Sequence, residues 1–265
     1  MPAPETPARF LVTGLPRSGT NLILHTLAFH PEVLAYNELF NPDRILWGSS
    51  AMDEEADPAY LALRAAHPLV FIEHVLSPGP PQCKTVGFKL FYMQASEVES
   101  KNYRLVWPWL RRMEGLKVVD VVRRNKLKQI FSWFLATETQ VWVREGGSRP
   151  QPPHSIALPF DVVDGYFHWY EDMERLRARQ LEGMDVLALD YETLAADFAP
   201  HMARIQEHLG VPVLPLAPAI RKQRTAHISE VLTNYRELRD RFVQTPYIKY
   251  FEMAEENAGC RGAAA

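Results

Sequence analysis

Short apolar runs of strand type recur along this chain, and polar or turn-forming residues follow each of them. The runs lie at residues 9–13, 86–91, 117–122 and 185–190, and they consist mainly of Val, Leu and Phe. Runs of this length are typical of strands buried on both faces of a parallel sheet. The pattern therefore predicts a buried, mostly parallel sheet.

Between these runs the apolar positions recur with the period of an α-helix. Residues spaced at i, i+3, i+4 and i+7 line one face, which packs against the sheet. We expect such faces at Ile23, Leu24, Leu27 and Ala28 before Pro31, at Leu127, Ile130, Phe131, Phe134 and Leu135, along residues 162–181, and at Val231, Leu232, Tyr235 and Leu238 after an N-cap at Ser229. Strands that alternate with helices favour an α/β fold, and we expect loops at 49–58, 77–81 and 146–153.

The composition narrows the classes of protein. The 265 residues suit one large α/β domain over 1–265, with flexible tails at 1–8 and 257–265. A formal net charge of −3 without a basic tract argues against a nucleic-acid partner. No apolar run approaches the roughly 20 residues that cross a bilayer. Residues 1–8 lack the order of a signal peptide, so we expect a cytoplasmic protein.

Cysteine and histidine do not indicate a metal site. Cys83 and Cys260 lie far apart and form no Cys-x-x-Cys spacing, so we interpret both as inert thiols. The nine histidines are scattered without the spacing of metal ligands. We therefore predict that the protein uses no metal.

The candidate chemistry begins directly after the first predicted strand. Gly14 and Gly19 stand at the spacing of a P-loop, in which backbone N–H groups and a helix N-terminus bind a phosphate-like group. Thr20 replaces the lysine of nucleotide hydrolases, and Asn21 replaces the residue that would hold magnesium. Arg17 lies inside the loop, where it can neutralise an anion without a metal ion. The alternative is a strand-to-helix turn that binds nothing.

In order and residue type this loop resembles the 5′-phosphosulfate loop of the sulfotransferases that use 3′-phosphoadenosine 5′-phosphosulfate (PAPS). The residues that carry the resemblance are Pro16, Arg17, Ser18, Gly19, Thr20 and Asn21. The resemblance extends from Phe10 to about Phe242, and the bacterial trehalose-sulfotransferase-like branch is the closest. It implies that the loop binds the phosphosulfate end of PAPS.

A second anion site is predicted where the strand at 117–122 ends in Arg123 and Arg124. Arginine at the carboxyl end of a strand offers a planar fork, and Ser132 in the next helix offers a hydroxyl, so one phosphate can contact both. This resembles the 3′-phosphate site of the sulfotransferases, in which a serine follows the arginine by eight or nine residues. Both arginines satisfy that spacing. The alternative is a pair of surface arginines that flank a helix.

Glu38 is the candidate general base. It stands in the segment 36–42, after the short apolar run 33–35. Enzymes of the bacterial branch carry a glutamate in a closely similar position as their proposed base, and the resemblance implies that role here. A base that removes the proton of an acceptor alcohol contributes about 10²- to 10⁴-fold. The animal-type enzymes use a histidine after a strand lysine, and this chain has the lysine but no histidine after it. The alternative for Glu38 is a solvated or helix-capping carboxylate.

Lys89 interrupts the apolar run 86–91, where an ammonium group without a partner would be costly to bury. One candidate partner, which the resemblance implies, is a sulfonate or bridging phosphate oxygen. The other is a carboxylate such as that of Glu38. The sequence leaves both open.

Two further segments resemble parts of the nucleotide site. Tyr191 stands in a strand-end segment like the tyrosine-acid pair near the nucleotide in this superfamily, and an ordinary strand-to-helix junction is the alternative. Lys222, Gln223 and Arg224 lie where the animal-type enzymes have Arg-Lys-Gly around the 3′-phosphate. Gln223 replaces that glycine, and a solvated basic turn is the alternative.

The resemblance implies a P-loop-kinase-like α/β domain of three layers, with a central, mostly parallel sheet and helices on both faces. It implies transfer of the sulfuryl group of PAPS to a hydroxyl of a carbohydrate, lipid or small metabolite, with Glu38, Lys89 and Arg17 as catalytic residues. The acceptor is not readable, because acceptor pockets are built from loops, and a homodimer stays open. A magnesium-dependent nucleotide kinase and a non-catalytic nucleotide-binding protein are the competing hypotheses.

Overall fold

The computed structural model describes residues 7–48, 57–77, 80, 82–96, 103–143, 155–220 and 227–262, with only the backbone of 256–262. The chain divides into two compact units. The first comprises Met1–Val122 and Arg175–Ile220, and the second comprises Arg123–Glu174 and Arg221–Ala265. That residues 1–265 form a single domain stays a prediction.

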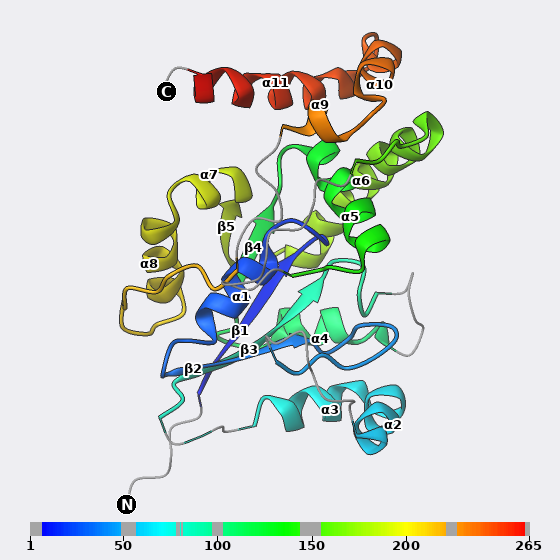
Figure 1. The fold of residues 1–265 in the computed structure, drawn as a ribbon. Helices are drawn as coiled ribbons and strands as arrows, with labels where there is room; N and C mark the ends of the chain where they lie inside the picture. The colour runs from blue at the N-terminus through cyan, green and yellow to red at the C-terminus, as the bar shows by residue number, and fades with distance from the viewer. Residues whose placement is uncertain are drawn as a thin grey trace, which may run out of the picture. The chain divides into compact units, whose positions relative to one another are not determined.

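The first unit is built on a five-stranded sheet with the order β2-β3-β1-β4-β5 (Figure 1). Every pair of neighbouring strands is parallel. The strands are β1 (Ala8–Gly14), β2 (Val33–Glu38), β3 (Thr85–Phe91), β4 (Lys117–Val122) and β5 (Asp185–Asp190). The four predicted strands are confirmed, and β2 develops from the short apolar run at 33–35.

Helices cover both faces of this sheet, which confirms the three-layer α/β fold. On one face Phe88 and Leu90 join a core with helices α3 and α4, and on the other Phe10 and Val12 join a core with α1, α7 and α8. The helices of this unit are α1 (Thr20–Leu27), α2 (Pro58–Ala66), α3 (Pro68–Val75), α4 (Val106–Arg112), α7 (Tyr191–Ala196) and α8 (Phe198–His208).

The second unit is helical and packs around aromatic side chains. Phe167, Phe242 and Phe251 are buried, and the rings of Phe242 and Phe251 stack with centroids 5.7 Å apart. Its elements are α5 (Lys126–Thr139), α6 (Phe160–Leu181, whose last residues belong to the first unit), α9 (Ile228–Val231), α10 (Tyr235–Phe242), the 3₁₀ helix η2 (Pro246–Ile248) and α11 (Lys249–Gly262).

The prediction of a single helix after an N-cap at Ser229 is wrong. The chain forms α9, which His227 caps, and α10 as separate helices. Leu232 between them is extended and forms a β-bridge with Ile156, and the amide of Thr233 donates to the carbonyl of Ile156 at 2.9 Å. This long-range bridge interrupts the helix although the apolar spacing continues across it.

Candidate functional site

The loop at residues 14–21 leaves the carboxyl end of β1, the central strand of the sheet. From β1 the chain continues to β2 and β3 on one side, and it then crosses to β4 on the other. Ligands of open α/β sheets bind at the carboxyl edge beside such a reversal of strand order. The predicted loop therefore stands where this fold class places a ligand.

The neighbours of both loop glycines leave no room for a side chain. A Cβ on Gly14 would lie 2.7 Å from Ser18 Oγ and from the carbonyl oxygen of Val121, and a Cβ on Gly19 would lie 2.4 Å from the ring of Tyr191. Gly19 also has a φ of 107°, which favours glycine. Tyr191 therefore packs directly against the loop.

Ser18 and the first turn of α1 offer polar groups to an external partner. Ser18 is 1% exposed, and its Oγ has no hydrogen-bond partner among the described residues. Gly19 is the N-cap of α1, no side chain caps this helix, and the first amides of a helix have no acceptor within it. Arg17 adds a positive charge and has a φ of 65°, a strained conformation that is common at functional sites. These features fit a bound anion.

Asn21 and Glu38, both half-buried, and the buried Lys89 form a polar cluster at the same edge of the sheet. Lys89 on β3 is 1% exposed, and its Nζ lies 2.9 Å from Oε1 of Glu38 at the end of β2. Lys89 Nζ also donates a hydrogen bond to Oδ1 of Asn21 in the first turn of α1. The structure thus brings the predicted base, the lysine and the end of the loop together. A carboxylate partner for Lys89 is confirmed, and contact with a sulfonate stays a prediction.

A β-bulge brings Glu38 to this face of the sheet. Tyr36 is in register with Phe88 on the face of α3 and α4, and in a regular strand Glu38 would lie on that apolar face. The register shifts between Tyr36 and Glu38, so Glu38 pairs with Lys89 instead. Bulges re-aim side chains next to active sites. Glu38 is therefore neither a helix cap nor a solvated loop carboxylate, and 14% of its side chain is exposed.

The second carboxylate oxygen of Glu38 is also held in place. Asn41 Nδ2 and Gln94 Nε2 donate to Oε2 at 3.0 and 2.9 Å. Burial raises the pKa of Glu38, but the charge of Lys89 and these hydrogen bonds outweigh burial and leave the pKa below its usual value. The carboxylate is therefore ionised at neutral pH, as a proton acceptor must be.

Two residues of this neighbourhood were not predicted. His25, one helical turn after Asn21, is buried, and its Nε2 has no partner among the described residues. Burial, and secondly the charge of Lys89, lowers the pKa of His25 to about 4. The helical spacing from Asn21 could have indicated His25, whereas Gln94 lies in the turn after β3, where no sequence pattern distinguishes it.

Arg123, Arg124 and Ser132 belong to the second unit. Arg123 is half-buried, Arg124 is exposed, and Ser132 is half-buried on α5. Burial raises the pKa of Tyr170 and the positive charge of Arg123 opposes that rise, which places Arg123 in the neighbourhood of this ring. The predicted residues Lys222, Gln223 and Arg224 lie outside the described residues.

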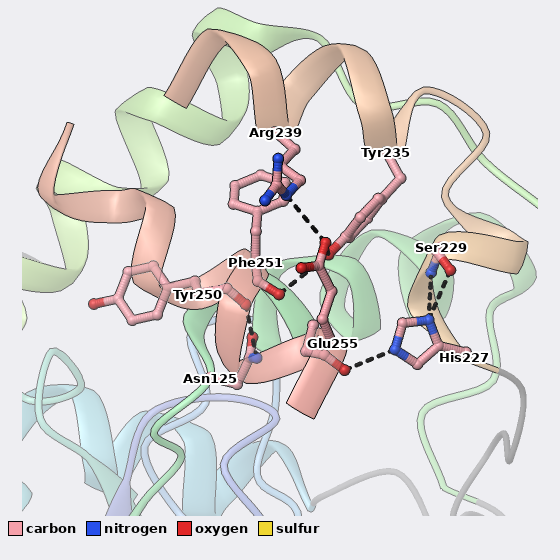
Figure 2. A network of polar contacts seen from close by, with 9 residues as sticks. Asn125, His227, Ser229, Tyr235, Arg239, Tyr250, Phe251 and Glu255 are labelled. Atoms are coloured by element: carbon pink, nitrogen blue, oxygen red, sulfur yellow. Dashed lines mark hydrogen bonds and ion pairs between the residues drawn. The ribbon is translucent and has the colours of Figure 1, made fainter. Parts of the chain in front are cut away.

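Asn125 joins the start of the helix that follows the two arginines to α11 (Figure 2). Its Oδ1 accepts from the amide of Lys128 at 2.9 Å, and its Nδ2 donates to the carbonyl of Tyr250 on α11 at 2.9 Å. One turn along α11, the carbonyl of Ala254 accepts from Nε2 of His227 at 2.7 Å. Helix α11 therefore holds both the N-cap of α5 and the N-cap of α9 in the second unit.

The part of the chain that the structure describes has neither a candidate metal site nor a membrane-spanning helix. No group of three or more His, Cys, Asp or Glu side chains could hold a metal ion there. No helix there is long and apolar enough to cross a membrane. Independence from metals stays a prediction.

The solved structures that align with this chain include a sulfotransferase and retinol dehydratase. A sulfotransferase from Alicyclobacillus acidocaldarius aligns with 93% of this chain and 94% of its own, at 14% identity and a TM-score of 0.45. Retinol dehydratase in a complex with retinol and PAP aligns with 95% of this chain and 82% of its own, at 14% identity and a TM-score of 0.44.

Sequence comparison returns relatives that span almost the whole chain. Nodulation protein H of Rhizobium meliloti (strain 1021) is 29% identical over 257 residues, which cover 94% of this chain and 97% of the relative. Nodulation protein H of Rhizobium tropici is 26% identical over 260 residues, which cover 97% of each chain. Over almost its whole length the chain is therefore similar to Nodulation protein H. No protein-family model matches the chain.

Proposed function

We propose that this protein is a PAPS-dependent sulfotransferase that moves the sulfuryl group of PAPS to a hydroxyl of a carbohydrate, lipid or other small metabolite, giving a sulfate ester and 3′,5′-ADP. The observation that carries the proposal is the contact between Lys89, Glu38 and Asn21. This contact between a carboxylate, an ammonium group and the last residue of the loop at 14–21 supports the roles of base, cation and anion-binding loop that we propose for them. Sulfuryl transfer needs a base for the acceptor hydroxyl and a cation for the leaving phosphate where the two substrates meet.

The proposed step forms a bond between the acceptor oxygen and sulfur while the bond from sulfur to the bridging phosphate oxygen breaks. Glu38 takes the proton of the acceptor hydroxyl. The electron pair passes to the leaving phosphate, where Arg17, the loop amides and Lys89 stabilise the negative charge. As in phosphoryl transfer, positioning and charge supply the catalysis, and we propose that no metal takes part.

The nucleotide contacts follow from the same proposal. The residues that would hold the phosphosulfate end are Pro16, Arg17, Ser18, Gly19, Thr20 and Asn21. Tyr191 would lie beside the nucleotide, and the 3′-phosphate would bind Ser132 with Arg123 or Arg124 and with Lys222, Gln223 and Arg224. The buried Oγ of Ser18 and the close packing of Tyr191 on Gly19 support this assignment. A cytoplasmic location and the absence of a nucleic-acid partner belong to the proposal on the grounds of sequence.

Labelled PAPS incubated with the purified protein and extracts of small metabolites tests the proposal. One metabolite should gain about 80 mass units, the mass of an added SO₃, together with release of 3′,5′-ADP. ATP with magnesium in place of PAPS is the control, because a kinase would add phosphate from ATP. Transfer from ATP and none from PAPS would contradict the proposal.

A further inference from the structure

The segment after β2 returns to the strand it has just left. The amide of Leu46 donates to the carbonyl of Glu38 at 3.1 Å, and the amide of Asn37 donates to the carbonyl of Trp47 at 3.1 Å. Residues 39–47 therefore form a closed loop whose two ends meet beside Glu38. The loop contains Asn41, whose side chain donates to the Glu38 carboxylate.

A single buried arginine holds the middle of this loop. Arg64 on α2 is 4% exposed, and its Nη1 donates to the carbonyls of Leu39, Asn41 and Arg44 at 2.8, 2.9 and 3.1 Å. Among the described residues no carboxylate forms an ion pair with Arg64, and its buried Nε has no acceptor. Burying a guanidinium without a counter-ion costs free energy. An ion pair therefore does not account for the burial of Arg64.

We propose that Arg64 is a positioning residue for Glu38 and acts through the backbone of Asn41. The inference rests on the proposed function, in which Glu38 accepts the proton. All three carbonyls accept from the one nitrogen Nη1, which carries two hydrogens, so at least two of them share a hydrogen, and together these contacts tie Leu39, Asn41 and Arg44 to α2. The loop in turn fixes the direction from which Asn41 reaches Oε2 of Glu38.

The inference predicts two linked effects of losing Arg64. The hydrogen bond from Asn41 lowers the pKa of Glu38, so a loosened loop should raise the pKa of this carboxyl. The base should also lose its fixed orientation, and small misplacements of a catalytic group cost on the order of 10²-fold in rate. A purely structural arginine would lower stability without changing the titration of Glu38.

The carboxyl pKa of Glu38 can be measured directly by ¹³C NMR of protein labelled at glutamate, with Glu38→Gln assigning the signal. The pKa should rise in Arg64→Met and in Asn41→Ala, by a smaller amount in Arg64→Lys, and no further in the double variant, because both changes break one connection. The matched control is Arg111→Met, which removes an arginine hydrogen bond to the carbonyl of Arg179 elsewhere in the first unit. If Arg64→Met does not fold, Arg64→Lys carries the comparison.

An unchanged titration of Glu38 in folded Arg64→Lys and Arg64→Met would overturn the inference, and so would equal shifts in Arg111→Met. This measurement uses no substrate. Failure of the parent protein to transfer sulfuryl groups would therefore contradict the proposed function and leave this test of Arg64 standing. In an active enzyme, kcat should fall in Arg64→Met while affinity for 3′,5′-ADP stays within about twofold of the parent.

Discussion

Glu38 and Lys89 occupy paired positions on the neighbouring parallel strands β2 and β3, with Glu38 Oε1 2.9 Å from Lys89 Nζ. The pairing satisfies the ammonium group of a buried strand lysine and keeps the carboxylate ionised. In the proposed mechanism the base and the cation that stabilises the leaving group therefore start as an ion pair. Protonation of Glu38 should abolish both the proton acceptor and this attraction, so the rate should fall as pH drops through the lowered pKa of Glu38.

Gly19→Ala should damage nucleotide binding. The new Cβ would lie 2.4 Å from the ring of Tyr191, at a φ of 107° that alanine rarely adopts. The matched control is Gly115→Ala, where φ is 69° and nothing lies within 4 Å of the new Cβ. Both variants should lose about 1 kcal/mol of stability from backbone strain. Calorimetry with 3′,5′-ADP should show a weakened affinity for Gly19→Ala alone, and equal affinities would contradict the packing of Tyr191 on the loop.

Arg17 should contribute to binding and not to folding. Its φ of 65° is strained for any residue except glycine, so Arg17→Gly should be at least as stable as Arg17→Ala in urea unfolding. Both variants should lose about 1.5–3 kcal/mol of affinity for 3′,5′-ADP, the usual contribution of a hydrogen bond to a charged group. Parental affinity in both would show that the loop cation does not contact the nucleotide.

The 3′-phosphate should be recognised separately from the 5′-phosphate. Affinity for 3′,5′-ADP should exceed that for 5′-ADP by about 2–4 kcal/mol, because an arginine and Ser132 would otherwise lose their anionic partner. Arg123 is half-buried and Arg124 is exposed, so Arg123→Gln should remove most of this difference, with Arg124→Gln as the control. Calorimetry that gives equal affinities for the two nucleotides would refute the second anion site.

His25 should make the fold sensitive to mild acid. The folded protein keeps His25 neutral down to a pKa of about 4, whereas in the unfolded chain a histidine has a pKa of about 6.5. A depressed folded-state pKa means that stability is lost as pH falls from about 6.5 toward 4, by about 2 kcal/mol between pH 7 and pH 5. Urea unfolding of His25→Leu should lack this part of the loss, whereas the exposed His168→Asn should keep it. The same loss in His25→Leu as in the parent would contradict the buried neutral imidazole.

The sequence predicted the sheet well where burial leaves a local pattern. The runs that became β3 and β4 are apolar on both faces, so their bounds were predicted within a residue. The division into α9 and α10 was missed because it depends on the contact of Leu232 with Ile156, which are far apart in the chain.

The candidate site was predictable in its parts and not in its assembly. The loop from Gly14 to Asn21 has a local signature of glycines and charge. The pairing of Glu38 with Lys89 depends on a one-residue bulge and on the register of strands that are far apart in sequence, which no local pattern specifies. Arg64 interrupts an otherwise apolar helix, which could have indicated a buried polar contact but not its three carbonyl partners.

Glu38→Gln tests the central claim most directly, because glutamine keeps the shape of the side chain and cannot accept the proton. We predict that this variant binds 3′,5′-ADP like the parent but loses on the order of 10²- to 10⁴-fold in kcat for sulfuryl transfer from PAPS. Glu32→Gln is the matched control, because Glu32 forms an ion pair with Lys84 instead. Turnover of Glu38→Gln near the parental rate, with the acceptor identified from metabolite extracts, would contradict the assignment of Glu38 as the base.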